Sequence, residues 1–180
     1  MLAMFIYLLL TLLLPLAPSG ASKVNQVLTQ LKESTGRQTY VLTESEINAF
    51  AAAAIESKKR LGVKKVVFDL KPGGKFTATA QINMDDVELT GLTFRMFQAL
   101  LSGTQTLQAQ GKFSADKGRG LYELESASFN SITVPAFLVN AVLSYLSKRQ
   151  PPHIDITEPF DLPYGVRQVS ITSNRLTITR

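Results

Sequence analysis

The chain of 180 residues contains no cysteine and only one histidine, His153. Without cysteine the protein has no disulfide framework, no thiolate zinc site, no iron–sulfur cluster and no cysteine nucleophile. A single histidine excludes a histidine-rich metal site within one chain. A Ser/His/Asp triad would have to use His153, and the chain has no Gly-x-Ser-x-Gly nucleophile elbow. These absences predict a protein with no covalent catalysis, no cofactor and no bound metal.

Charged side chains are also scarce, at 18% of the residues against 45% that are hydrophobic. This balance is typical of neither a disordered chain nor a charged tail. A chain of this length favours one domain, and it can bury a core without disulfides or metals. The net charge of +5 suits an anionic partner such as a phospholipid headgroup. Nucleic acid is not the expected partner, because no aromatic residues interleave with the cations.

Residues 1–21 carry no charged side chain and form an apolar run that ends in the small residues Ser19 and Ala21. This pattern is typical of a secretory signal peptide. The run is shorter than the roughly 20 apolar residues that span a bilayer comfortably. We therefore expect export, cleavage after Ala21 and a mature domain over 22–180 in a periplasmic or other extracytoplasmic compartment. The run has no preceding Lys or Arg, so retention as a membrane anchor stays an alternative.

Apolar residues at spacings of three and four predict two helices early in the mature chain. The first covers 22–36 and ends near Gly36. The second begins at Thr43-Glu44-Ser45-Glu46, a capping box in which the Thr43 hydroxyl and the Glu46 carboxylate each satisfy a backbone amide. Its expected buried face is Ile47, Phe50, Ala51, Ala54 and Ile55.

Alternating apolar residues predict three hairpins in the rest of the chain. The first pairs 66–70 with 76–84, the second pairs 107–113 with 122–126 across a turn at 114–120, and the third pairs 166–171 with 176–178 across Ser173-Asn174. Short apolar stripes predict further helices over 94–101 and from Pro135 onward, the latter apolar nearly all round. Helices that alternate with hairpins predict an α+β fold with a long antiparallel sheet packed against helices.

Two charged clusters interrupt this pattern. Asp85, Asp86 and Glu88 could hold a hard cation, but without a glycine-turned calcium loop a solvated strand end is expected. The basic cluster contains Lys58, Lys59, Arg60, Lys64 and Lys65. Each cation would contribute about 1 kcal/mol toward an anionic membrane surface. The alternative is a solvated helix end followed by a solvated strand start.

Small residues occupy the middle of the two longest predicted strands. Ala78 and Ala80 lie between Phe76 and Met84, and Ala109 and Gly111 lie between Leu107 and Phe113. Small inward residues either let a helix pack closely or leave room for a ligand. Both interpretations stay open at this point.

Three short motifs resemble bacterial proteins of the YpmS-like and LmeA-like type. They are the helix start at 42–48, the strand–Val-Pro–helix step from Ser128 to Pro135, and the ending at 162–166 followed by Val169 and 176–178. These proteins are identified as members of the tubular lipid-binding (TULIP-like) group. The resemblance implies a long curved sheet that wraps a helix and encloses acyl chains. The mature chain is shorter than a full tubular domain, which implies a shallow groove or one completed by a partner.

The function expected from the resemblance is binding of a phospholipid, fatty acid or similar amphiphile between sheet and helix. The residues expected to line the groove are Phe50, Ile82, Met84, Phe94, Phe97, Leu107, Phe113, Phe137, Leu138, Val142 and Tyr145. One alternative is a cell-envelope scaffold or interaction protein with a solid core and no small-molecule ligand. Another is an enzyme that uses Asp69 or Asp86 as a base, which requires a buried acid with a raised pKa. Alternation places Asp69 on the solvated face, which counts against the enzyme.

Overall fold

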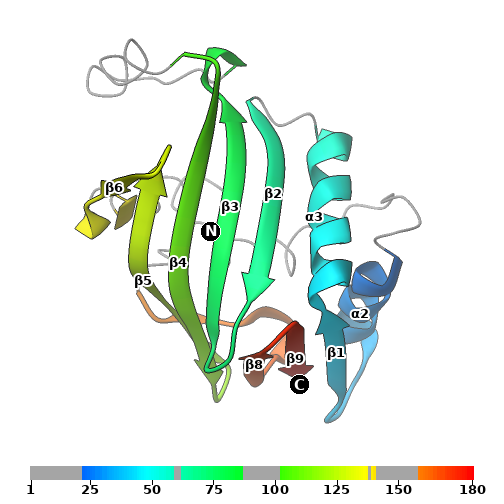
Figure 1. The fold of residues 1–180 in the computed structure, drawn as a ribbon. Coiled ribbons are helices and arrows are strands. Elements are labelled where there is room, and N and C mark those ends of the chain that lie inside the picture. Colours follow the sequence, from blue (N-terminus) through cyan, green and yellow to red (C-terminus); the bar gives the residue numbers. More distant parts are fainter. Residues whose placement is uncertain (1–21, 59–61, 87–101, 138, 141–157) are drawn as a thin grey trace.

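The computed structural model describes residues 22–58, 62–86, 102–137, 139–140 and 158–180. These residues form a curled antiparallel sheet, a half-barrel, with two helices beside it (Figure 1). The expected α+β class is confirmed. The predicted signal peptide over 1–21, the predicted helix over 94–101 and most of the predicted helix after Pro135 lie outside the described residues. None of the helices described is both long and apolar enough to cross a membrane.

Both early helices form where the apolar spacing predicts them. Helix α2 runs from Ser22 to Glu33 and buries Val24, Val27, Leu28 and Leu31. Helix α3 runs from Glu44 to Lys58. The capping box is confirmed at its start, because the Thr43 amide donates to Glu46 Oε2 (2.7 Å) and the Glu46 amide donates to Thr43 Oγ1 (3.3 Å).

The sheet has nine strands, and every described strand pair is antiparallel. Their bounds are β1 Thr39–Thr43, β2 Val63–Leu70, β3 Lys75–Asn83, β4 Thr104–Asp116, β5 Arg119–Phe129, β6 Ile132–Val134, β7 Phe160–Asp161, β8 Gln168–Thr172 and β9 Arg175–Thr179. The order along the sheet is β1-β9-β8-β4-β3-β2, and β5 pairs with β4, β6 and β7. Two short 3-10 turns, η2 (Met84–Asp86) and η3 (Pro163–Gly165), follow β3 and precede β8.

All three predicted hairpins are confirmed, with one correction to a turn. The loop expected over 114–120 is much shorter, because β4 extends to Asp116 and β5 begins at Arg119. Only Lys117 and Gly118 connect the strands, and both have positive φ angles, 49° and 85°. A two-residue hairpin turn with both φ angles positive matches the right-handed twist of the strands it joins. Alternation did not predict β1, β6 and β7. Strands β6 and β7 are too short to show it, and β1 has three consecutive apolar residues, Tyr40, Val41 and Leu42. A strand before Pro135, where β6 lies, was implied only by the resemblance.

The sheet curls where β8 replaces β3 on one edge of β4. The β3–β4 pairing starts at Lys75 opposite Lys112, and beyond that point Ala115 pairs with Val169 of β8. The Gly74 amide donates to Ile171 O (3.2 Å) between the two pairings. The β8–β9 hairpin and β1 thereby close the lower end of the half-barrel in Figure 1.

Helix α3 lies along β2, the last strand in the sheet order, and protects its edge (Figure 1). The side chain of Asn48 donates to Phe68 O (2.8 Å) and accepts from the Phe68 amide (2.7 Å), as a neighbouring strand would. Glu44 Oε2 accepts from the Leu70 amide (2.7 Å). These side chains satisfy backbone groups that would otherwise offer a template for another strand.

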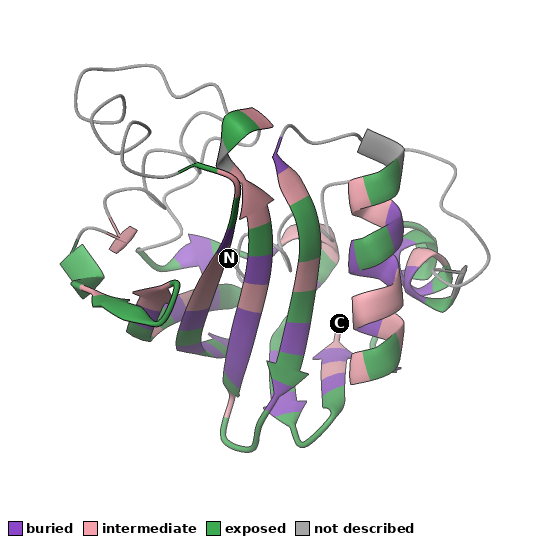
Figure 2. Cartoon of the chain, turned by 45° about the horizontal axis from the view of Figure 1, so that its top comes forward, coloured by how far each residue is buried: buried purple, intermediate pink, exposed green. Residues whose placement is uncertain are grey.

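The hydrophobic core lies between the inner face of the sheet and the two helices. In Figure 2 the buried positions on β2 and β3 concentrate toward the turn that joins them. The largest fully buried side chains are Phe68, Phe76, Phe113, Leu28, Leu31, Leu42, Ile47, Leu70 and Ile178. One continuous cluster therefore joins α2, α3, the long strands and the last hairpin.

Candidate functional site

The inner face of the four long strands follows from their register, because directly paired residues point to the same side of a sheet. Ala78 pairs with Phe68 on β2 and with Ala109 on β4, and Ala109 pairs in turn with Ala127 on β5. The apolar and small residues on this face include Val66, Phe68, Leu70, Phe76, Ala78, Ala80, Ile82, Leu107, Ala109, Gly111, Phe113, Leu124, Ala127 and Phe129. Two polar groups lie on the same face, the Tyr122 hydroxyl and the side chain of Gln105. Gln105 pairs with Ile82, is buried, and forms hydrogen bonds with Ser102 O and Asn130.

This face divides into two parts along the strands. The part nearer the β2–β3 turn, which includes Ala78, belongs to the continuous core. Farther along, Ala80, Ala109 and Ala127 are buried at 1%, 3% and 3% exposure but lie outside that core cluster. We call these three residues the alanine cluster. Four partly exposed residues on the same face lie around it: Val66, Ile82, Leu107 and Phe129.

Tyr122 lies where the two parts meet. A Cβ on Gly111 would come within 2.7 Å of Tyr122 Cε2 and 3.1 Å of its hydroxyl oxygen, so the ring occupies the space above the glycine. The lack of a side chain at Gly111 therefore allows the Tyr122 ring to pack closely against β4. The hydroxyl is buried and has no hydrogen-bond partner within the described part of the chain, and burial raises the pKa of Tyr122 above its usual range. A buried polar group without a partner is rare and requires an explanation.

The residues predicted to line a groove fall into different environments. Ile82 and Leu107 lie partly exposed on the inner face beside the alanine cluster. Phe50 and Phe113 belong to the continuous core, where the Phe113 ring centroid lies 6.4 Å from that of Phe160. Phe137 is 70% exposed.

The turn that contains Phe137 has an orientation different from the predicted one. The Val139 amide donates to Pro135 O (3.4 Å), so the expected helix does start at Pro135. However, Val139 packs against the core while Phe137 faces solvent. A helix that is apolar nearly all round carries no clear stripe, so its sequence does not fix which side faces the core.

The other predicted lining residues lie outside the described part of the chain. They are Phe94, Phe97, Leu138, Val142 and Tyr145, together with the side chain of Met84 in η2. His153 and Glu88 are outside it as well.

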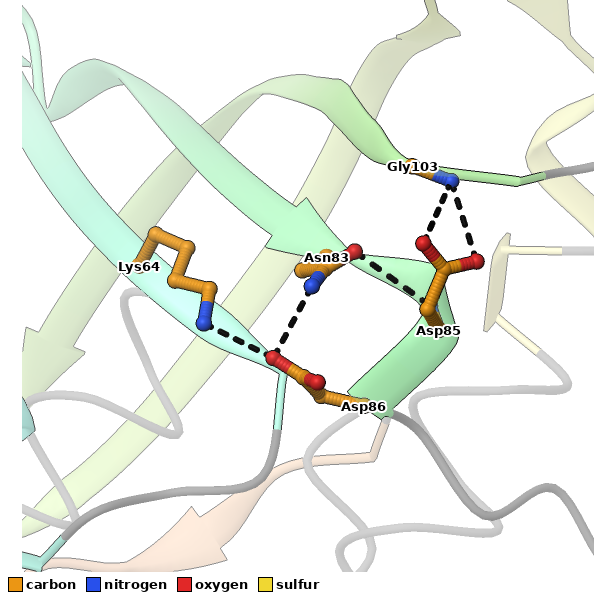
Figure 3. Close-up of polar contacts among 5 residues, drawn as sticks. All are labelled: Lys64, Asn83, Asp85, Asp86 and Gly103. Carbon is orange, nitrogen blue, oxygen red and sulfur yellow. Dashed lines mark hydrogen bonds and ion pairs between the residues drawn. The ribbon is translucent and has the colours of Figure 1, made fainter.

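The acidic cluster after β3 is used for local hydrogen bonds (Figure 3). Both carboxylate oxygens of Asp85 accept from the Gly103 amide at 3.1 Å, which joins η2 to the start of β4. Asp86 Oδ2 accepts from Lys64 Nζ at 2.7 Å and from Asn83 Nδ2 at 2.9 Å, and these two bonds hold the pKa of Asp86 below its usual value. Within the described ranges, no group of three or more potential metal ligands is present.

The basic cluster is only partly described. Lys64 and Lys65 are exposed on β2, and the ion pair with Asp86 offsets part of the Lys64 charge. Lys59, Arg60 and the side chain of Lys58 lie outside the described residues.

Neither of the two carboxylates considered as a catalytic base has the required environment. Asp69 is exposed, as its position in the alternation predicts, and lies 3.4 Å from Lys71 Nζ. The pKa of Asp86 is lowered rather than raised. A general base near neutral pH needs the opposite shift.

Sequence reasoning missed Tyr122, Ala127 and Phe129 as members of the candidate site. Tyr122 was placed on the second hairpin, but the opposition of its ring to Gly111 depends on the bulge between Gln110 and Gly111, where the register shifts. A bulge adds a residue to one strand. The isolated Gly111 in the middle of β4 is the sequence signal for it, but a glycine alone does not give the direction of the register shift.

Comparison with known proteins returns no match. No protein-family model, no curated protein and no solved structure matches the chain. The fold and the geometry above are therefore the basis for any functional conclusion.

Proposed function

We propose that this is an exported protein that binds a lipid or other apolar amphiphile against the inner face of its half-barrel. The observation that carries the proposal is the alanine cluster: three small residues on adjacent strands, surrounded by partly exposed apolar side chains and separate from the continuous core. Ligand sites are typically apolar and concave, with a few polar groups that fix orientation.

The apolar surroundings of the alanine cluster suit an acyl chain. Burying each methylene group contributes about 0.8 kcal/mol, so a partly enclosed chain stays bound without specific polar contacts. Ile82 and Leu107, two of the residues expected to line the groove, lie beside the cluster. The other wall would come from the apolar helix expected after Pro135.

The hydroxyl of Tyr122 provides one polar contact for such a ligand. It is buried and has no partner among the residues that the structure describes, and the tyrosine ring extends over Gly111 next to Ala109. A ligand with a carbonyl, ester or carboxylate oxygen would accept a hydrogen bond from it. Phospholipids and fatty acids carry such oxygens at the head of an acyl chain.

Export and an anionic membrane surface are part of the same proposal. The apolar leader over 1–21 supports export, and the net charge of +5 supports attraction to anionic phospholipid. The exposed lysines 64 and 65 would be the described part of a membrane-facing basic patch.

The experiment is native mass spectrometry of the exported protein, purified without detergent. We expect a discrete mass increment that resolves into phospholipid or fatty acid after extraction. A bare polypeptide mass, together with no uptake when liposomes are offered, would overturn the proposal.

A cell-envelope interaction protein is the second candidate, and one observation favours it. Ile132 and Phe137 are 73% and 70% exposed, and they lie close in sequence around the short strand β6. Large exposed apolar residues are common at protein interfaces. Two results together would favour this function. The experiment above would give a bare polypeptide mass, and the protein would form a dimer or capture an envelope partner. The Ile132→Ser/Phe137→Ser double variant would lose that association.

A further inference from the structure

Three arginines from distant parts of the sequence meet at one end of the last three strands. Gln168 pairs with Thr179, so Arg167 and Arg180 follow at the same end of β8 and β9. The Arg167 amide donates to Thr179 O (2.8 Å), and the Arg180 amide donates to Gln38 O (2.9 Å), beside Arg37. A pocket of about 360 Å³ lies between them and is lined by Gly36, Arg37, Gly165, Arg167 and Arg180.

The two glycines shape this pocket. Gly165 has a φ angle of +69°, and a Cβ there would lie 3.1 Å from Arg180 Nε. The absence of a side chain lets the guanidinium of Arg180 lie against the main chain. Gly36 has a φ angle of +112°, which side-chain-bearing residues rarely adopt, and no atom lies within 4 Å of where its Cβ would be. At Gly36 the pocket is therefore lined by backbone atoms alone.

None of the described Asp and Glu side chains forms an ion pair with the pocket arginines. Lys23, Lys64, Lys75 and Arg119 each lie within 4.0 Å of a carboxylate oxygen, but none of the three pocket arginines does. Arg180 Nη1 is buried without a hydrogen-bond partner among the described residues. A buried guanidinium nitrogen without an acceptor is costly, and a bound anion would supply the acceptor.

We propose that this pocket binds a phosphate group, carried either by a lipid headgroup or by free phosphate. Guanidinium groups donate paired hydrogen bonds that match the geometry of phosphate oxygens. Three of them suit a group with more than one negative charge better than a single carboxylate. Ligand pockets commonly span about 300–1,000 Å³, so this pocket accommodates a phosphate with a small substituent and excludes a whole lipid.

This site is independent of the proposed apolar site. None of its lining residues comes from β2, β3, β4 or β5, whose inner face carries the alanine cluster. A protein that carries no acyl chain could still bind phosphate here, and the reverse also holds.

The test compares the full exported chain with an Arg37→Ala/Arg167→Ala double variant and with Arg175→Ala. Arg37 and Arg167 are exposed, so the double variant is expected to fold, which a thermal unfolding curve verifies. Arg175 is a matched control, because it is an exposed arginine at the opposite end of the β8–β9 hairpin. Inorganic phosphate is titrated calorimetrically in a chloride buffer. Vesicles of phosphatidylcholine, with or without phosphatidic acid, are offered in a flotation assay.

We expect the parent protein to bind phosphate saturably. The affinity should fall roughly tenfold or more in the double variant, the equivalent of one or two charge-assisted hydrogen bonds. Arg175→Ala should leave the affinity unchanged. Calorimetric binding of inorganic phosphate would identify a site for free phosphate. Arginine-dependent flotation with phosphatidic acid alone would identify a headgroup site. Binding in neither assay, or an equal loss in Arg175→Ala, would overturn the proposal.

Discussion

Glu46 has two roles at the start of α3. Its carboxylate caps the helix through the Thr43 amide, and it forms an ion pair with Lys23 of α2 at 2.9 Å. Partial burial raises the pKa of Glu46, but the hydrogen bonds from Thr43 and Lys23 outweigh it, so the pKa lies below 4.5, the ordinary value for a glutamate. A carboxyl whose pKa is lower in the folded state contributes stability above its unfolded pKa and loses that contribution as the pH falls.

We therefore expect Glu46→Gln to lower the free energy of unfolding at pH 6 by more than it does at pH 3. The difference should disappear as the pH falls from 4.5 through the folded-state pKa. Urea unfolding at a series of pH values measures it. Glu56→Gln, an exposed glutamate on the same helix, is the control. Equal pH dependence in both variants would contradict the assignment of this contribution to Glu46.

Tyr122→Phe tests the second residue with an unusual environment. The variant removes a buried hydroxyl that has no partner, a group whose burial costs about 1–3 kcal/mol. We expect the free energy of unfolding of the lipid-free protein to be unchanged or increased. If the hydroxyl contacts the bound amphiphile, native mass spectrometry will show less lipid in the variant. A loss of stability with no change in lipid content would contradict both expectations.

At the scale of the element, α3 is held to β2 by side chains that take the place of a strand. Asn48→Ala removes two hydrogen bonds with the Phe68 backbone, so we expect a loss of about 1–3 kcal/mol in the free energy of unfolding. Urea unfolding measures the loss. Asn25→Ala is the matched control, because Asn25 is a partly exposed asparagine on α2, a helix that does not lie along β2 (Figure 1). Equal effects of the two substitutions would show that the edge of β2 does not depend on Asn48.

The exposed edge of β2 is expected to have a second consequence in the same variant. Unpaired strand edges promote association between sheets. Asn48→Ala should therefore associate more readily than the parent protein in analytical ultracentrifugation. An unchanged sedimentation profile would mean that the helix itself covers the edge without this side chain.

At the scale of the whole molecule, two alanines on one strand separate the continuous core from the proposed ligand site. Ala78 belongs to the continuous core and Ala80 does not, although both point to the inner face. We expect Ala78→Leu to lower the free energy of unfolding by about 1–3 kcal/mol through overpacking. Ala80→Leu should instead reduce the lipid mass increment, with a smaller effect on the lipid-free protein.

The same pair of variants distinguishes the two candidate functions. Urea unfolding and native mass spectrometry are applied to both proteins. Equal destabilisation by Ala78→Leu and Ala80→Leu, with no lipid in either, would mean that the face is filled by protein and would favour the interaction protein.

The sequence by itself determined the elements that depend on local pattern. Apolar spacing placed α2 and α3, the capping box placed the start of α3, and alternation placed the long strands. These features depend on residues within a few positions of one another, so they are readable without a fold. The turn at Lys117-Gly118 was predicted to be longer than it is. Strands β4 and β5 extend beyond the alternating apolar residues from which they were predicted.

Only the tertiary structure decided which distant groups meet. Three contacts depend on strand order and register. They are the pairing of β8 with β4 beyond the end of β3, the packing of the Tyr122 ring over Gly111, and the hydrogen bonds of Asn48 with the edge of β2. The pocket joins Arg37 to Arg167 and Arg180, which follow it by more than a hundred positions, and no local pattern brings Arg37 to them. The sequence sets the local conformation of each segment, but long-range pairing decides which side chains share a site, and that pairing exists only in the folded chain.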